Sequence, residues 1–270
     1  MSYTLTTQDG CTFGRFSLFP EDAVTHGVTT RHGGVSRPPY DTLDLALHVG
    51  DDDAEVIENR RRLCGALGLD FERLTMAEQV HGEAIFRVTE AEAGRGRLSY
   101  ADAIPQTDAL MTDVPGLPLM LCYADCTPIL LFDPVRRAVA VAHGGWKGTA
   151  RAIAAKTVRA MADAFGTRPE DCLAAIGPAI GPCCYEVGDE VATSFRAAFP
   201  DKADAWLFEK NGRCRLDLWR ANRDQLEGAG LRPDHIENAD ICTACHADTY
   251  YSYRAVGGRT GRIGAVMAIR

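Results

Sequence analysis

Three short apolar runs near the middle of the chain, each bounded by polar or turn residues, constrain the fold most strongly. They span residues 117–122, 128–132 and 138–142. Runs of this length and composition predict buried strands. Cys126 stands between the first two runs, and His143 directly follows the third. Because sheets commonly carry their sites at strand ends, we expect these two side chains to lie close together.

A cysteine and a histidine at neighbouring strand ends are compatible with two kinds of chemistry. They form a nucleophile with its general base, or two ligands of one zinc ion. A third interpretation is that Cys126 is a small buried residue and His143 a hydrogen-bonded histidine before a turn. Gly144 and Gly145 argue against it, since glycines beside a polar side chain suggest a close approach of the backbone. The residues alone leave metal binding and nucleophilic catalysis open.

The acidic composition argues against several classes of function. The chain of 270 residues has a net charge of -8, which disfavours a general binder of nucleic acids or anionic membranes. No apolar run reaches the roughly 18 residues of a membrane span. The first residues lack the basic and apolar segments of a signal peptide, so we expect a cytoplasmic protein. The ten cysteines are then expected to be buried, metal-bound or catalytic rather than paired in disulfides.

Patterns elsewhere predict a mixture of strands and helices in one domain spanning residues 1–270. Residues 90–106 resemble a loose connection, but nothing in them marks a domain boundary. Other predicted strands are 43–49, 84–88, 173–176 and 263–269. Predicted helices run from Asp52 or Asp53 to Gly68, from near Thr149 to Gly166, and over 189–199 and 216–228.

Four cysteines form two close pairs late in the chain. Cys183 and Cys184 are adjacent, and vicinal cysteines seldom bind one ion, so we predict that they have a packing role. Cys242 and Cys245, followed by His246, match the attachment pattern of c-type haem. That attachment requires export, for which the sequence has no signal, and a single CxxC pair is a weak indication of zinc. We predict that none of the four binds a catalytic metal.

Five segments taken together resemble the polyphenol-oxidase/laccase-domain family, whose members have been redescribed as purine nucleoside phosphorylases with adenosine deaminase activity. The resemblance covers nearly the whole chain, and several such motifs in this order are highly specific. The segments are Gln79-Val80-His81-Gly82, Thr107-Asp108-Ala109-Leu110, Ala124-Asp125-Cys126-Thr127-Pro128, Ala142-His143-Gly144-Gly145-Trp146-Lys147-Gly148 and Ile180-Gly181-Pro182-Cys183-Cys184-Tyr185-Glu186-Val187.

The resemblance implies an α+β fold, a single domain of mixed β-sheet layered with helices. It also implies a zinc site formed by His81, Cys126 and His143. Three protein ligands with one position left open are typical of a catalytic zinc. Copper is a possible substitute, because cysteine and histidine also bind it.

The resemblance further implies phosphorolysis of adenosine, inosine and methylthioadenosine to the base plus ribose 1-phosphate or its methylthio analogue. Deamination of adenosine to inosine is the second expected activity. Asp125 is the candidate general acid/base, or else a carboxylate that orients a ligand or caps a turn. Arg31, Lys147 and Arg254 are candidates to bind phosphate, and His48 is a candidate catalytic residue in the same pocket. The family usually has Arg where this chain has Lys147, which keeps the charge but loses bidentate geometry.

Three other functions remain as alternatives. Copper-dependent oxidation of phenols is the older description of the family, but laccase chemistry needs many histidines, and this chain has seven and no His-x-His pair. A metal-free hydrolase would use Cys126 as nucleophile and His143 as base, which leaves His81 without a role. A non-enzymatic binding module does not explain three ligands with an open position.

Overall fold

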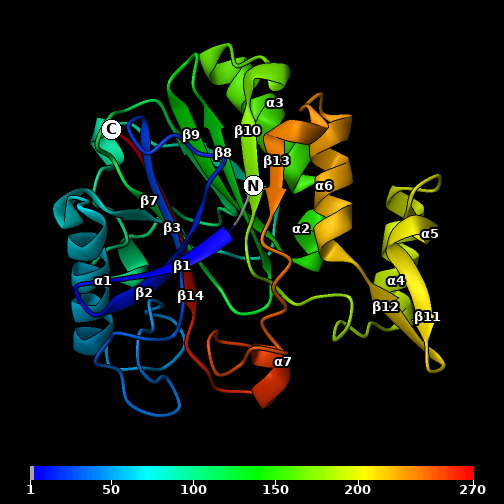
Figure 1. Cartoon of the computed structure of the whole chain (residues 1–270), viewed down its shortest axis with the longest axis horizontal. Helices are drawn as coiled ribbons and strands as arrows, with labels where there is room; N and C mark the ends of the chain where they lie inside the picture. The colour runs from blue at the N-terminus through cyan, green and yellow to red at the C-terminus, as the bar shows by residue number, and fades with distance from the viewer. Residues whose placement is uncertain (1–2) are drawn as a thin grey trace.

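Two six-stranded β-sheets stack face to face at the centre of the computed structural model, which describes residues 3–270 (Figure 1). The first sheet has the order β1 (Tyr3–Gln8), β2 (Cys11–Phe16), β3 (Val24–Thr29), β14 (Ile263–Ile269), β7 (Leu119–Tyr123) and β4 (Thr75–Met76). The second has the order β13 (Ile236–Asn238), β10 (Leu173–Ile176), β8 (Thr127–Asp133), β9 (Ala138–Gly144), β6 (Ala109–Thr112) and β5 (Ile85–Arg87). Both sheets combine parallel and antiparallel pairs.

The central strands of both sheets are buried along their whole length, and their side chains alternate between two apolar faces. In β7, Leu119 and Leu121 face the core between the sheets, whereas Met120 and Cys122 face the opposite side. Helix α1 (Asp53–Leu67) covers that opposite side of the first sheet. The outer face of the second sheet packs against α3 (Ile153–Phe165) and α6 (Leu218–Gly228). The result is the expected α+β arrangement of mixed sheets layered with helices.

The ends of α1 agree with the predicted boundaries. The Asp52 carboxylate accepts hydrogen bonds from the N–H groups of Ala54 and Glu55. Gly68 ends the helix with a φ of 67°, in the left-handed region that glycine adopts without strain.

Two predicted elements differ in the structure. Residues 43–49 form no strand, because their carbonyl groups bind side chains of α1: Asn59 donates to Asp44 O, and Arg60 donates to Leu45 O. The helix expected from Thr149 to Gly166 is two helices, α2 (Trp146–Ala150) and α3. They are separated at Ala152, which has a φ of 61°.

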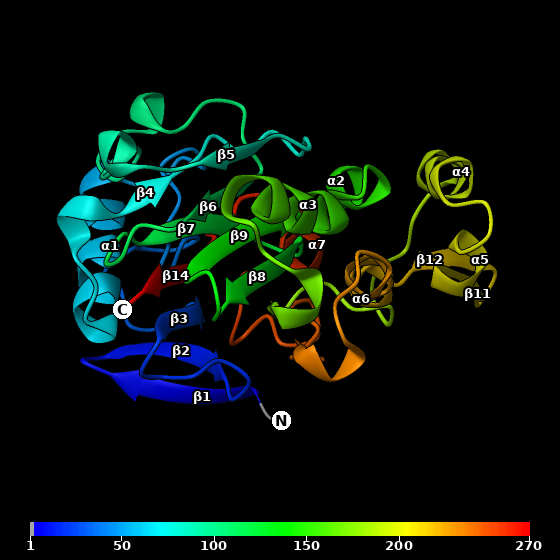
Figure 2. The same ribbon diagram turned by 90° about the horizontal axis from the view of Figure 1, so that it is seen from above.

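A small unit projects from the sheets (Figures 1 and 2). It contains α4 (Asp189–Ala198), α5 (Ala203–Trp206), β11 (Leu207–Lys210) and β12 (Arg213–Leu216). Its core surrounds the buried side chains of Phe195 and Trp206 and continues into the start of α6 at Leu218. Leu216 belongs to β12 rather than to the helix predicted over 216–228. Within residues 3–270, the remaining helices are α7 (Tyr253–Val256) and five short 3₁₀ turns, Phe71–Arg73, Glu90–Glu92, Tyr100–Asp102, Pro169–Asp171 and Pro233–His235.

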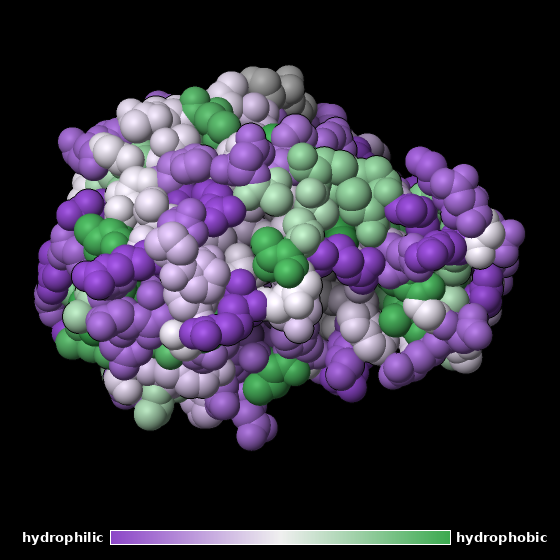
Figure 3. Space-filling model, turned by 90° about the horizontal axis from the view of Figure 1, so that it is seen from below, coloured by the Kyte–Doolittle hydropathy of each residue, from purple (hydrophilic) through white to green (hydrophobic). Residues whose placement is uncertain are grey.

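The surface shown in Figure 3 is mainly hydrophilic, with hydrophobic residues in separate patches. Within residues 3–270, no helix is both long and apolar enough to cross a bilayer.

Candidate active site

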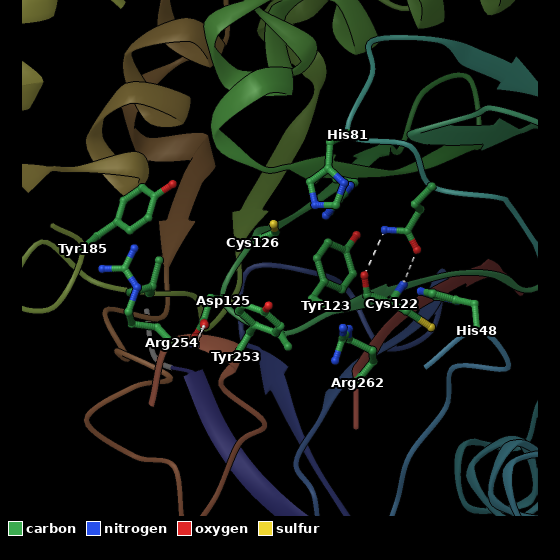
Figure 4. Close-up of a pocket in the computed structure, with 14 residues that line it drawn as sticks. His48, His81, Cys122, Tyr123, Asp125, Cys126, Tyr185, Tyr253, Arg254 and Arg262 are labelled. Atoms are coloured by element: carbon green, nitrogen blue, oxygen red, sulfur yellow. Dashed lines mark hydrogen bonds between the residues drawn. The ribbon is translucent and has the colours of Figure 1, made fainter. Parts of the chain in front are cut away.

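A cavity of about 440 Å³ opens where β7 ends and β8 begins, beside the end of β9 (Figure 4). This volume is in the range of pockets for small organic ligands. Its lining combines histidines, a cysteine, tyrosines and arginines contributed by distant segments. The residues are His48, Gln79, His81, Cys122, Tyr123, Ala124, Asp125, Cys126, His143, Ile180, Tyr185, Tyr253, Arg254 and Arg262.

Three potential metal ligands meet in one wall of this cavity. Nitrogen atoms of His81 and His143 and the sulfur of Cys126 lie within 4.8 Å of one another. The pairing of β8 with β9 explains part of this: Pro128 lies opposite His143, so Cys126, two residues earlier, is at the same end of the sheet. His81 comes from the loop between β4 and β5. In the view of Figure 4, His81 and Cys126 lie together, with Tyr253 and Arg262 across the pocket.

A buried carboxylate, Asp108, orients two of these ligands. Its Oδ1 accepts a hydrogen bond from His143 Nδ1 at 2.8 Å and one from the N–H of His81 at 3.0 Å. Its Oδ2 accepts from the N–H groups of Gly82 at 2.6 Å and Val80 at 3.2 Å. With Nδ1 bound to Asp108, the Nε2 atom of His143 is left to face Cys126 or an ion.

The electrostatics of the group favour a thiolate at Cys126. Burial would raise the pKa of this thiol, but His143 and His81 outweigh it and lower the pKa to about 6. Burial would likewise lower the pKa of His143, but Cys126 and Asp108 raise it to about 9. A thiolate is both a metal ligand and a nucleophile, so these shifts suit either chemistry. Binding of a metal ion would displace the proton of His143.

Gly145 allows the ligands to approach the backbone. A Cβ atom at this position would lie 3.1 Å from the sulfur of Cys126 and 3.1 Å from Cδ2 of His81. A side chain at residue 145 would therefore crowd two of the potential ligands, which would have to shift by a few tenths of an ångström. This confirms the close approach that the paired glycines indicate in the sequence.

We expect Gly145→Ala to weaken metal binding roughly tenfold, since overpacking of about 1.4 kcal/mol would displace two ligands. Titration against a competing chelator measures the affinity. Gly188→Ala is the matched control, because a Cβ there meets nothing within 4 Å. An unchanged affinity in Gly145→Ala would show that the ligands do not depend on this approach.

Asp125 lines the pocket with both carboxylate oxygens engaged. Oδ1 accepts a hydrogen bond from the hydroxyl of Thr243, and Oδ2 accepts one from the N–H of Arg254 in the first turn of α7, each at 2.7 Å. These contacts correspond to the turn-capping role considered for this residue. Arg254 also lines the pocket, and its guanidinium packs on the ring of Tyr185.

His48 lines the pocket together with Arg262. Burial is the main cause that lowers its pKa to about 4, and the charges of Arg262 and Arg60 add to the effect. His48 is therefore neutral near pH 7, so it can donate or accept a hydrogen bond but adds no positive charge.

The other two candidate phosphate ligands are outside the pocket lining. Arg31 forms an ion pair with Asp41 at 3.1 Å and donates to the carbonyl of Ala247. Lys147 is exposed on α2 with its amine over the ring of Trp146. Neither contributes to the cavity in this structure.

Sequence interpretation gave no role to four residues that the structure brings to the site: Asp108, Tyr185, Tyr253 and Arg262. Two of them, Asp108 and Tyr185, stand in the segments that carry the resemblance, which was an available signal. Their positions in the site could not be predicted, because each lines the pocket or bonds there with residues far away in the sequence.

A two-sheet α+β fold with a His₂Cys group in an open pocket defines a class of protein with a candidate catalytic metal centre. Residues 25–270 match the family model described as multi-copper polyphenol oxidoreductase laccase, and the chain belongs to this family. The resemblance found in the sequence is thereby confirmed.

Similar proteins carry a different functional name. The purine nucleoside phosphorylase YlmD of Geobacillus stearothermophilus is 43% identical over 245 residues, 90% of this chain and 89% of the relative. A purine nucleoside phosphorylase of Deinococcus radiodurans is 41% identical, over 93% of this chain and 91% of the relative. The crystal structure of YlmD from Geobacillus stearothermophilus matches with a TM-score of 0.91 and 41% identity, over 96% of each chain.

Proposed function

We propose that this protein is a purine nucleoside phosphorylase that also deaminates adenosine, with zinc held by His81, Cys126 and His143. The observation that carries the proposal is the His₂Cys group opening into a cavity large enough for a nucleoside. The names of the relatives support the choice of substrate class.

The donor set fits one zinc ion. Two imidazole nitrogens and one thiolate leave a fourth position toward the cavity, as in catalytic zinc sites. Copper also binds such ligands, but a multi-copper centre needs further histidines. Within residues 3–270, the other group of three or more potential ligands consists of cysteines alone. The donor set therefore does not fit a multi-copper laccase centre.

The cavity contains cations suited to phosphate. Arg254 and Arg262 line it, and guanidinium groups bind phosphate oxygens through charge-assisted hydrogen bonds. We assign phosphate binding to Arg254 and Arg262, because Arg31 and Lys147 do not line the cavity. His48, being neutral, would hydrogen-bond the nucleoside rather than neutralise phosphate.

Aromatic side chains offer a surface for the purine. Tyr185 and Tyr253 line the cavity, and the half-exposed ring of Tyr253 is accessible for stacking on a base. When bound, zinc would supply Lewis acidity at the adjoining wall, which deamination by water requires.

The test of this function is to incubate the protein with adenosine, with and without phosphate, and to separate adenine from inosine. We expect adenine and ribose 1-phosphate only with phosphate, and inosine in both reactions. Absence of phosphate-dependent adenine, with inosine and methylthioadenosine also uncleaved, would contradict the phosphorylase assignment.

Asp125 is proposed to position Arg254 rather than to transfer a proton. Asn at this position can still accept from the Arg254 N–H while its amide donates to Thr243. The neutral amide accepts more weakly than the carboxylate, so we expect Asp125→Asn to raise KM for phosphate slightly while kcat stays within about tenfold. Asp125→Ala, which removes both contacts, should raise KM further.

Steady-state kinetics across pH distinguish the two roles of Asp125. General acid–base catalysis typically contributes about 10²- to 10⁴-fold. A loss of kcat of that size in Asp125→Asn, with loss of one limb of the pH profile, would make Asp125 the general acid/base instead.

A further inference from the structure

Four cysteines from two distant segments converge beside the pocket. The sulfur atoms of Cys183, Cys184, Cys242 and Cys245 all lie within 4.8 Å of one another, and we call this group the four-cysteine cluster. The Cys183–Cys245 and Cys184–Cys245 sulfur separations are 3.5 and 3.4 Å. None of these cysteines forms a disulfide in the structure. The predicted packing role for Cys183 and Cys184 does not account for this convergence, since Cys183 and Cys245 are exposed.

The separations suit a tetrahedral ion. Zinc–sulfur bonds of about 2.3 Å place thiolates about 3.8 Å apart at the corners of a tetrahedron. A disulfide needs sulfur atoms about 2.05 Å apart. The observed separations of 3.5 and 3.4 Å lie much nearer to the tetrahedral distance than to the disulfide bond length.

Backbone contacts hold the two segments of the cluster together. The N–H of Thr243 donates to Ala179 O at 3.0 Å, and Ala179 and Cys242 form a parallel bridge. The N–H of Gly181 donates to the sulfur of Cys242 at 3.2 Å. An N–H group aimed at sulfur stabilises a thiolate, and outer contacts of this kind orient metal ligands.

Positive charge is available to offset the charge of the cluster. Four thiolates around a divalent cation carry a net charge of two negatives. Arg254 donates to the carbonyl of Cys184 at 3.4 Å, and Arg215 donates to the carbonyl of Cys183. Both guanidinium groups are therefore anchored to the backbone of the vicinal pair, where they would favour the anionic complex.

We propose that the four-cysteine cluster binds a second, structural zinc ion. Four protein ligands close the coordination sphere, which is the arrangement of structural rather than catalytic zinc. The site is separate from the His81, Cys126 and His143 group, so the prediction that these cysteines do not bind the catalytic metal is retained. The proposal does not depend on which reaction the pocket performs.

The position of the cluster indicates what such an ion would stabilise. Ile180 and Tyr185 flank the vicinal cysteines and line the pocket. Thr243, between Cys242 and Cys245, donates to Asp125, which also accepts from the N–H of Arg254. An ion joining the two segments would thus fix the pocket wall that carries Tyr185 and Arg254.

The test is the zinc content of reduced protein after equilibration with zinc and removal of loosely bound metal. We expect two ions per chain in the unaltered protein, one in Cys183→Ser/Cys245→Ser, and one in Cys126→Ala. Cys214→Ser, which changes a partly buried cysteine outside the cluster, should keep two. One ion per chain in the unaltered protein, lost in Cys126→Ala, overturns the proposal, and so does a double variant that keeps both ions.

X-ray absorption at the zinc edge of the Cys126→Ala protein provides a second measurement that requires no change in the cluster. We expect a shell of sulfur atoms alone at about 2.3 Å. A shell containing nitrogen or oxygen ligands, or no bound zinc in folded Cys126→Ala protein, would refute the tetrathiolate site.

Discussion

Replacement of His81, Cys126 or His143 by alanine is expected to remove the metal ion of the pocket and to reduce conversion of adenosine to inosine by roughly a hundredfold or more. The magnitude follows because loss of a catalytic metal forfeits several kcal/mol of charge stabilisation in the transition state. The three donors lie within 4.8 Å of one another, so each variant leaves two ligands, too few for a stable site. Metal analysis and the rate of inosine formation measure the two effects.

Matched controls separate ligand loss from general damage. His32→Ala changes an exposed histidine outside the pocket lining, and Cys214→Ala changes a cysteine outside both ligand groups. Both controls should retain metal and activity. Full occupancy of the pocket site in any one of the three alanine variants would remove that residue from the ligand set.

Asp108→Asn is expected to lower metal affinity by about 10- to 100-fold, the usual consequence of altering a residue that orients a metal ligand. Both oxygens of Asp108 accept hydrogen bonds, Oδ1 from His143 and Oδ2 from the N–H of Gly82. An asparagine has one acceptor oxygen, so its amide nitrogen must face either the imidazole N–H or backbone N–H groups. His81 would also be displaced, because its N–H binds the same carboxylate.

Asp113→Asn provides the control for this experiment. Asp113 lies just beyond the other end of β6, outside the pocket lining, and pairs with Arg87 on the surface at 3.1 Å. Its amide variant should bind metal normally. Equal affinity in Asp108→Asn and the unaltered protein would show that the carboxylate does not orient His143 in the metal-bound state.

Local signals predicted those elements whose boundaries depend on neighbouring residues. Strands β10 (Leu173–Ile176) and β14 (Ile263–Ile269) occupy the predicted positions because each is an apolar run that ends at turn residues. Helix α1 was also predicted from local residues, since Asp52 caps its start and Gly68 caps its end.

Contacts between distant residues explain the elements that were mispredicted. Residues 43–49 have the composition of a strand, but Asn59 and Arg60 bind their carbonyl groups from α1. No periodicity within the segment reveals those partners. The four-cysteine cluster has the same origin, since spacing within each cysteine pair says nothing about their meeting across 62 residues.

In the candidate site, too, some residues were predicted from local patterns and others were not. The proximity of Cys126 and His143 was predicted from strand ends, and the register of β8 with β9 accounts for it. His81 entered through the family resemblance, because no local pattern connects it with the other two ligands. Asp108 was part of a quoted motif, yet its role depends on a hydrogen bond to His143 that only the folded chain forms.

The most direct test of the central claim is the rate of inosine formation from adenosine by metal-stripped protein, before and after zinc is restored. We predict loss of deamination on stripping and recovery with zinc, because the attacking water depends on the ion. Alkylation mapped to Cys126 by peptide analysis should be slow in the zinc-loaded protein and fast after stripping, which confirms that the metal has left this residue. Deamination at the full rate by stripped protein with a free Cys126 thiol would contradict the zinc centre. If alkylation of Cys126 then abolished deamination by the stripped protein, the result would favour the metal-free cysteine hydrolase.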